Sequence, residues 1–124
     1  MNFTVEKTEQ YDLLKVVADK LNGVISGELK DLMEESITNG QRNLVLDLSD
    51  TKFCDSSGLS AILVGNRRCN QTEGMFVVAG AKDMVMKLIT LSQLDKVLTL
   101  VPTVSEAHDM IVMSEVEKQL NDEN

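Results

Sequence analysis

The stretch at residues 43–65 constrains the fold more than any other part of the chain. It reads Asn-Leu-Val-Leu-Asp-Leu-Ser-Asp-Thr-Lys-Phe-Cys-Asp-Ser-Ser-Gly-Leu-Ser-Ala-Ile-Leu-Val-Gly. Its first part contains a short apolar run rich in strand formers, Leu44, Val45, Leu46 and Leu48, which favours a strand buried on both faces of a sheet. The polar residues that follow favour a turn. We expect Phe53 and Cys54 to be buried again after this turn.

A helix is predicted to begin immediately after that segment. Asp55, Ser56 and Ser57 are all residues that cap helix N-termini well. An apolar stripe with the i, i+3, i+4 spacing of a helix then follows at Leu59, Ile62 and Leu63. The sequence therefore places two serine hydroxyls at the N-terminus of a helix that comes shortly after a buried strand.

Two interpretations of these serines remain open on the local pattern alone. The N-terminus of a helix carries unpaired N–H groups and the positive end of the helix dipole, so it accommodates an anion, including a phosphate attached to a capping serine. Alternatively, Asp55, Ser56 and Ser57 only cap the helix, as such residues commonly do. The local pattern also does not distinguish Ser56 from Ser57 as a phosphate acceptor.

The charge and composition of the chain argue against direct binding to nucleic acid. The net charge is −8, which opposes association with a polyanion, and aromatic residues make up only 3% of the chain, with no Trp. The only basic pair, Arg67-Arg68, falls in the last turns of the predicted helix, where positive charge offsets the helix dipole. A contact with an anion or a partner is the alternative for this pair.

The length of the chain and its apolar runs predict the number of domains and the location of the protein in the cell. A chain of 124 residues fits one domain. No apolar run approaches membrane-spanning length, and the first dozen residues are rich in charge, unlike a signal peptide. We therefore expect a cytoplasmic protein that does not associate with a membrane.

The sequence predicts no enzyme, metal or cofactor site. Cys54 and Cys69 do not form a C-x-x-C pair, so both are expected to be reduced, packed thiols. His108 is the only histidine, and a solvated surface position is expected for it rather than metal binding. A hydrolase that used Ser56 or Ser57 would need His108 as its base, and the G-x-S-x-G elbow is absent.

Hydrophobic periodicity and turn residues predict the other elements. Strands are expected at residues 3–7, 11–17, 44–48, 75–79 and 98–101, and the first two form a hairpin. Helices are expected at 26–38, with Ser26 as its cap, at 57–72, at 82–92 and from Thr103 onward, with Glu106 completing a capping box. Residues 19–23 are predicted to be a turn. This order calls for an α/β fold with a mostly parallel sheet of about five strands, an opening hairpin and about four packed helices.

Apolar residues on the later helices are expected to face the core. The predicted buried stripe of the helix at 82–92 is Met84, Val85, Leu88 and Leu91, and that of the final helix is Val104, Ala107 and Ile111. The seven methionines are interpreted mainly as core filling, with Met86 off the stripe and exposed. The acidic, polar end of the chain is predicted to be a fraying helix end and a tail.

The run at residues 45–63, Val-Leu-Asp-Leu-Ser-Asp-Thr-Lys-Phe-Cys-Asp-Ser-Ser-Gly-Leu-Ser-Ala-Ile-Leu, resembles a known signature. It is similar to that of STAS domains, the family of bacterial anti-sigma factor antagonists, V-L-D-L-S-x-V-x-F-[ILM]-D-S-S-G-L-x-x-[IL]-L. Residues 91–100 are similar to the family's L-x-G-L-D-x-x-[FIL] stretch, with Gln93 in place of Gly, and residues 103–107 to its S-x-x-E-A end. The resemblance implies a single STAS-type domain at 1–113, followed by a polar acidic tail at 114–124.

The resemblance also implies a function. In this family the unphosphorylated protein binds an anti-sigma factor that is also a serine kinase, which frees a sigma factor; phosphorylation ends the complex and a phosphoserine phosphatase restores it. Carried onto this sequence, the acceptor is Ser56. The surface around the helix that begins near Ser57 is expected to bind the partner, through Asn22, Asp55, Ser57, Ser60, Val64 and Arg67. For Val64, packing against a neighbouring helix is the alternative.

Further expectations follow from the same resemblance. The protein is expected to be a monomer or a weak dimer and to have no enzymatic activity. An alternative function is that of a STAS accessory subunit in a transporter or lipid-transport complex, without phosphorylation. Relatives of that kind often lack the D-S-S pair that is present here as Asp55, Ser56 and Ser57.

One departure from the family pattern lies in the loop at residues 19–23. The family usually has G-x-L-D here, whereas this chain has Asp19 in place of Gly and Asn22 in place of Asp. The family's Asp lies close to the phosphorylated serine. Asn22 offers hydrogen bonds but no charge, so it either changes the electrostatics around Ser56 or acts only as a turn former.

Overall fold

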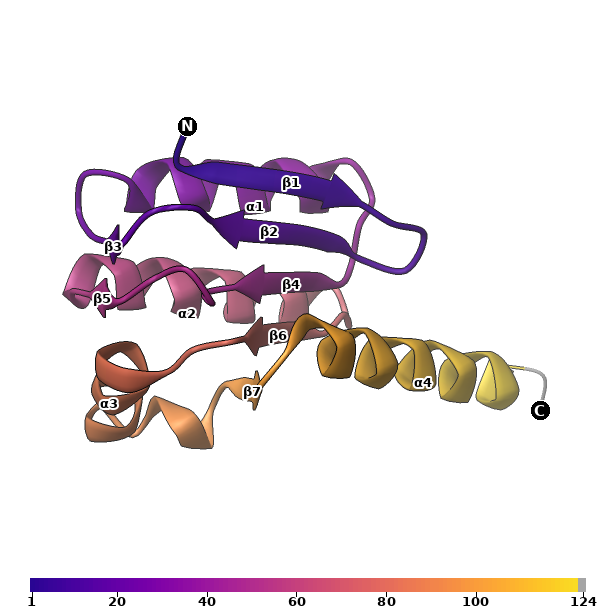
Figure 1. Ribbon diagram of the computed structural model, residues 1–124. Helices are drawn as coiled ribbons and strands as arrows, with labels where there is room; N and C mark the ends of the chain where they lie inside the picture. The colour runs from indigo at the N-terminus through magenta and orange to yellow at the C-terminus, as the bar shows by residue number, and fades with distance from the viewer. Residues whose placement is uncertain (123–124) are drawn as a thin grey trace.

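The computed structural model describes residues 1–122, which form a five-stranded sheet between layers of helices (Figure 1). The strands lie in the order β1-β2-β4-β6-β7, with β1 antiparallel to β2 and the other neighbouring pairs parallel. Their bounds are Phe3–Lys7 for β1, Asp12–Val16 for β2, Leu44–Asp47 for β4, Phe76–Ala79 for β6 and Thr99–Val101 for β7. The predicted mostly parallel sheet with an opening hairpin is therefore confirmed.

Two further strands form a small second sheet beside one end of the first. Strand β3 (Lys20–Leu21) pairs in parallel with β5 (Phe53–Cys54). The prediction of a simple turn at residues 19–23 was thus wrong at Lys20 and Leu21. The predicted burial of Phe53 was also wrong, because 48% of this residue is exposed. Strand β5 pairs with β3 and lies outside the main sheet, so Phe53 is not enclosed between the two helical layers that cover that sheet.

Helices cover both faces of the main sheet. Helix α1 (Ser26–Thr38) and helix α2 (Ser56–Gln71) pack side by side on one face, and α4 (Val104–Asp122) lies on the other (Figure 1). Helix α3 (Asp83–Leu91) lies near β5 at the end of the sheet, and a short 3-10 helix, η1 (Leu94–Lys96), follows it. The four predicted helices are all present.

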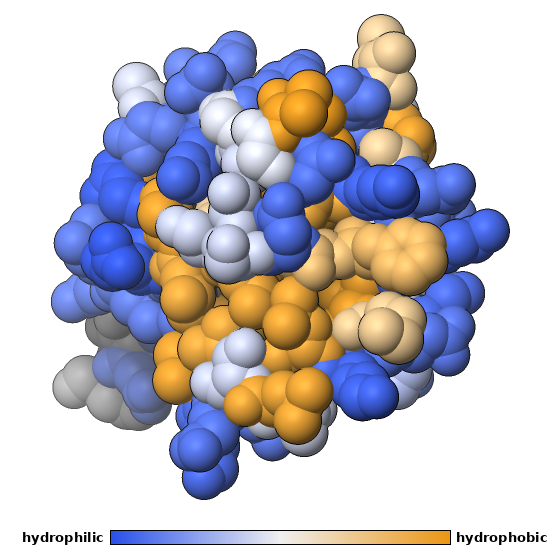
Figure 2. All heavy atoms as spheres, turned by 90° about the vertical axis from the view of Figure 1, so that its left-hand side faces the viewer, coloured by the Kyte–Doolittle hydropathy of each residue, from blue (hydrophilic) through white to orange (hydrophobic). Residues whose placement is uncertain are grey.

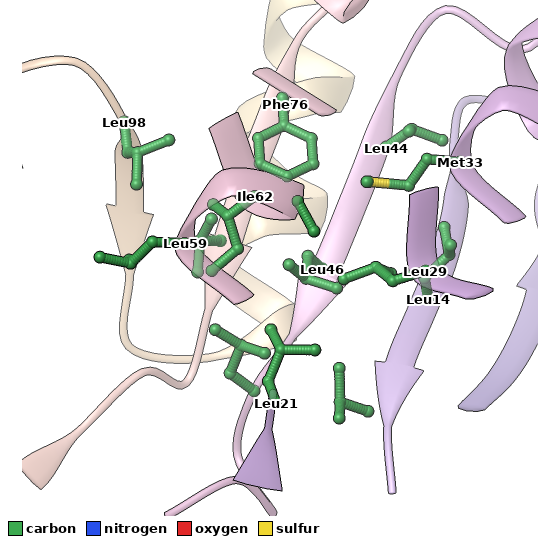
Figure 3. Close-up of a cluster of buried hydrophobic side chains, with 14 of the residues drawn as sticks. Leu14, Leu21, Leu29, Met33, Leu44, Leu46, Leu59, Ile62, Phe76 and Leu98 are labelled. Carbon is green, nitrogen blue, oxygen red and sulfur yellow. The ribbon is translucent and has the colours of Figure 1, made fainter. Parts of the chain in front are cut away.

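The alternation of strand β4 divides the core between these two layers. Leu44 and Leu46 join a large cluster with residues of α1 and α2, part of which is shown in Figure 3, whereas Val45 points to the opposite side and packs in the cluster of α4. Successive side chains of a strand point to opposite faces, so a central strand covered on both sides is apolar at successive positions. This explains the run of Leu44, Val45 and Leu46, which ends at Asp47, the last residue of β4, whose Oδ1 accepts a hydrogen bond from the amide of Ser49.

Helix α3 is rotated relative to its predicted orientation. Val85 and Ile89 are fully buried, but Met84 and Leu91 are 52% and 72% exposed. The predicted stripe was therefore wrong at these two positions, because the helix turns the side of Val85 and Ile89, four residues apart, toward the core. The interpretation of the methionines as core filling was wrong as well: among the described residues only Met33 is buried, and Met86 is partly buried rather than exposed.

The ends of helices α1 and α4 differ in part from the predicted ones. Helix α1 has Ile25 as its cap, without a side-chain bond, so Ser26 is its first residue rather than its cap. At the start of α4 the amide of Glu106 donates to Thr103 Oγ1, which is one of the two hydrogen bonds of the predicted capping box. Helix α4 continues to Asp122, and Asn43 Nδ2 donates to Glu115 Oε1 at 2.8 Å. Glu115 therefore packs on the domain, and the division at residue 113 stays a prediction.

Candidate functional site

The candidate site is the N-terminus of helix α2. Asp55 is the N-cap: its backbone is extended, and its Oδ1 accepts a hydrogen bond from the amide of Gly58 at 2.9 Å. Ser56 and Ser57 are then the first two helical residues. Ser56 is exposed, whereas Ser57 is partly buried. Of the three cap candidates in the sequence, Asp55 takes the capping role and leaves the Ser56 side chain at the surface.

The carboxylate of Asp55 also connects the helix to the loop that follows β3. Its Oδ2 accepts a hydrogen bond from the amide of Gly23 at 3.3 Å, and the amide of Asp55 donates to the carbonyl of Leu21 at 3.2 Å. The parallel pairing of β3 with β5 brings these two segments together. The site is therefore built from two parts of the chain that are more than thirty residues apart in sequence.

Asn22 forms the turn that leads into helix α1. Its Oδ1 accepts from the amide of Val24 at 3.0 Å, and its carbonyl accepts from the amides of Ile25 and Ser26. An asparagine side chain commonly folds back in this way onto the backbone two residues on. Asn22 and Asp55 also line one shallow depression of about 260 Å³. The residue thus has a turn-forming role and a place beside the cap of α2.

Gly58 allows the close packing on which this site depends, and the sequence analysis did not single it out. A Cβ atom on Gly58 would lie 2.4 Å from the carbonyl oxygen of Leu21 and 2.6 Å from Cys54 Sγ. Both distances are shorter than any ordinary contact, so only glycine fits without movement of the loop. The signal in the sequence was the unbroken D-S-S-G run, in which the amide of the glycine donates a hydrogen bond to the capping aspartate.

The electrostatics of the helix N-terminus favour an anion. The carboxylate of Asp55 accepts a hydrogen bond from the amide of Gly58, and its backbone carbonyl accepts one from the amide of Leu59. Within residues 1–122, the amides of Ser56 and Ser57 have no protein partner. Such free amides, together with the helix dipole, stabilise negative charge at this position.

The thiol of Cys54, next to the cap, is held in its protonated form. Burial, and secondarily the charge of Asp55, raises the pKa of the Cys54 thiol to about 11. The thiol therefore stays protonated at neutral pH, and only a thiolate reacts readily. Burial likewise raises the pKa of Cys69 to about 12, and both cysteines are free, as predicted.

The other predicted contact residues lie along the outer side of α2. Ser60 and Arg67 are exposed, and Val64 is partly buried. Their spacing from Ser56 places them on one stripe of the helix, because residues separated by four, eight and eleven positions share a face. Arg68, by contrast, points toward α1, where its Nε donates to Glu34 Oε2 at 2.8 Å.

Two other features, metal-ligand groups and membrane-spanning helices, are absent from the described part of the chain. No group of three or more His, Cys, Asp or Glu side chains within residues 1–122 is arranged to hold a metal ion. His108 lies on α4, where its Nδ1 is 3.0 Å from the hydroxyl of Tyr11. None of the described helices combines the length and the apolar character needed to cross a membrane.

Comparison with known proteins gives matches over most of the chain. The family model of the STAS domain matches residues 3–107. The anti-sigma F factor antagonist of Paenibacillus polymyxa is 31% identical over 103 residues, which cover 79% of this chain and 86% of that protein. Among solved structures, a putative anti-sigma factor antagonist of Thermotoga maritima has a TM-score of 0.78 at 22% identity, covering 88% of this chain and 93% of the other. The Bacillus cell fate determinant SpoIIAA in its phosphorylated form has a TM-score of 0.70 at 19% identity, covering 88% and 98%.

Proposed function

The chain belongs to the STAS domain family, and on that premise we propose that it is an anti-sigma factor antagonist controlled by phosphorylation of Ser56. The observation that carries the proposal is the position of Ser56: an exposed hydroxyl at the N-terminus of α2, immediately after the capping carboxylate of Asp55. Matched relatives named as anti-sigma factor antagonists support the same role.

The proposed cycle has two states. The unphosphorylated protein binds an anti-sigma factor that is also a serine kinase, and the sigma factor is thereby freed. The kinase then catalyses attack of Ser56 Oγ on the γ-phosphorus of ATP: the Oγ–P bond forms, the bond to ADP breaks, and the hydroxyl proton passes to a base of the kinase. A phosphatase that hydrolyses the phosphoserine restores the binding state.

Exposure favours Ser56 over Ser57 as the acceptor. A kinase must bring both ATP and its catalytic base to the serine hydroxyl, which requires an accessible side chain. Ser57 is partly buried, and a Cβ atom built on Gly23 would lie only 3.4 Å from its Oγ, so this hydroxyl faces the loop after β3. The geometry therefore supports the choice of Ser56 that family resemblance suggested.

Local charge explains how one phosphate ends the complex. Phosphorylation adds about −1.5 to −2 charge at pH 7. The free amides of α2 stabilise this charge within the protein itself, so phosphorylation leaves the domain folded. In a closed interface, however, the phosphate lies beside the Asp55 carboxylate and loses its hydration, and both effects oppose binding.

The proposal is tested by phosphorylation with defined kinases. Each anti-sigma factor of the serine kinase type encoded by the same genome is purified and incubated with the protein and Mg-ATP. One of them is expected to form a complex with the protein and to add a single phosphate, seen as a gain of about 80 Da in intact mass. If none binds or phosphorylates it, and the protein instead purifies with a membrane transporter, the accessory-subunit alternative replaces this proposal.

Acidic substitutions at Ser56 are expected to imitate the phosphorylated state in part. Ser56→Asp and Ser56→Glu should weaken binding to the kinase by about 1–3 kcal/mol, because each places a like charge beside Asp55 in the interface. Ser56→Gln is the matched control, since it has the size of glutamate without the charge. Titration calorimetry measures all three, and equal affinities for Ser56→Glu and Ser56→Gln would contradict an electrostatic switch.

A change at Asn22 tests the departure from the family pattern. Asn22→Asp should leave the unfolding temperature nearly unchanged, because an aspartate oxygen accepts the same bond from the amide of Val24. The added charge lies beside Asp55, so the phosphorylation rate or the release of the phosphorylated product should change, and more at low salt than at high salt. Identical kinetics at both salt concentrations would leave Asn22 with its turn-forming role alone.

A further inference from the structure

The end of the molecule that carries Ser56 also exposes a continuous hydrophobic area. Figure 2 looks onto this end and shows the area at its centre and in its lower part. Phe53 and Met84, about half exposed, and Val17 line a depression of about 710 Å³ in volume. We name the area formed by Phe53, Met84, Leu88 and Leu91 the β5–α3 face. Extended exposed apolar areas of this kind mark sites of interaction.

The composition of helix α3 is more apolar than its own packing requires. Val85 and Ile89 are buried in the core beneath the helix, and Leu88 is partly buried against it. Met84, Leu88 and Leu91 are spaced by four and three residues, so they form a second apolar stripe to one side of the buried one. Met84 and Leu91 on this stripe are mostly exposed. A surface helix normally places polar residues there.

The β5–α3 face is continuous with the phosphorylation site. Phe53 lines two neighbouring depressions: one contains Asp55 and Asn22, and the other contains Met84. Phe53 is separated from Ser56 by only Cys54 and Asp55. The depression beside the Asp55 cap and the β5–α3 face therefore adjoin at Phe53, so one partner protein can contact both.

Charge argues for such a protein rather than a second copy of this chain. The chain carries −8 overall, so two copies repel one another. The walls of the larger depression are close to balanced, with Lys52 and Lys82 against three aspartates, of which Asp50 is paired with Lys15 at 3.3 Å. A nearly neutral, apolar area on an acidic protein suits the buried centre of an interface with a different protein.

We propose that the β5–α3 face is the apolar anchor of the complex with the anti-sigma factor kinase, beyond the contacts along α2. This inference rests on the proposed function, because it assigns a second part of the surface to the same partner. In the complex, Phe53 and Met84 fill apolar hollows of the kinase while Ser56 reaches its active site. Large apolar side chains at the centre of an interface contribute most of its binding energy.

The test uses three variants and the kinase that phosphorylates the wild-type chain in the assay above. Phe53→Ser and Met84→Ser remove the anchors. Met113→Ser is the matched control, because Met113 is 59% exposed on α4, on the other face of the sheet. Circular dichroism and thermal unfolding verify that each variant is folded. Calorimetry then gives the affinity, steady-state phosphorylation gives kcat and KM, and analytical ultracentrifugation gives the oligomeric state.

The expected result is a loss of affinity of roughly tenfold to a hundredfold for Phe53→Ser and Met84→Ser, and none for Met113→Ser. KM should rise with kcat nearly unchanged, because docking contacts are equally present before and during phosphoryl transfer. Wild-type affinity in both anchor variants overturns this inference and leaves the proposed function standing. A wild-type dimer that Phe53→Ser converts to a monomer also overturns it, since the face then binds a second copy. Absence of any phosphorylating kinase overturns it together with the proposed function.

Discussion

Replacing Ser56 with alanine is expected to abolish phosphorylation while the protein keeps its fold and its affinity for the kinase. The substitution removes the only atom that can accept the phosphoryl group at this position. Asp55, rather than Ser56, caps the helix, and alanine is a good helix former, so unfolding free energy should change by no more than about 0.5 kcal/mol. Intact-mass analysis after incubation with kinase and Mg-ATP measures the effect directly. The variant should bind the kinase constitutively, because no phosphate forms to end the complex.

Two other serines of the same region serve as controls for this result. Ser57→Ala removes a partly buried hydroxyl one residue away, and Ser49→Ala removes one in the segment after β4. Both variants should still gain a single phosphate. Peptide mapping that placed the phosphate on Ser57 or Ser49 in the wild-type protein would contradict the assignment of Ser56, even if Ser56→Ala reduced the rate.

The framework of the fold follows from local sequence patterns. The apolar run at residues 44–48 predicted a strand covered on both faces, and the burial of Leu44, Val45 and Leu46 between two helical layers confirms it. The start of α2 was predicted equally well, because cap residues followed by an apolar stripe are a local signal. Such patterns work where a residue's environment depends on its near neighbours in sequence.

The errors arose where the environment depends on distant parts of the chain. Strands β3 and β5 have two residues each, and neither has a pattern of its own; they exist because the loops after β2 and β4 lie side by side. On α3, periodicity identified an apolar helix but not which of its sides the core would cover. Met84 and Leu91 were therefore predicted to be buried, as was Phe53 on β5. All three residues are exposed, and they form part of the β5–α3 face.

The packing between the two loops of the site leads to the second large expected effect, that of Gly58→Ala. The new methyl group would lie 2.4 Å from the carbonyl oxygen of Leu21 and 2.6 Å from Cys54 Sγ, so β3 must move away from α2. That movement strains the bonds that Asp55 accepts from Gly23 and Gly58. Overpacking of this kind typically costs about 1–3 kcal/mol. Alanine's better helix propensity offsets up to about 1 kcal/mol of this cost.

We expect Gly58→Ala to lower the free energy of unfolding by about 1–2 kcal/mol, measured by urea denaturation, and to slow phosphorylation of Ser56 because the cap is displaced. Gly27→Ala is the matched control: Gly27 lies in the first turn of α1, and a Cβ atom there meets nothing within 4 Å. Neither glycine has a positive φ, so the two positions differ in the space available for a Cβ atom and not in backbone conformation. The same chemical change should therefore stabilise the protein at Gly27, by up to about 1 kcal/mol, and destabilise it at Gly58. Equal stability of the two variants would mean that the approach of β3 to α2 is not as close as described, and that the position of Ser56 does not depend on it.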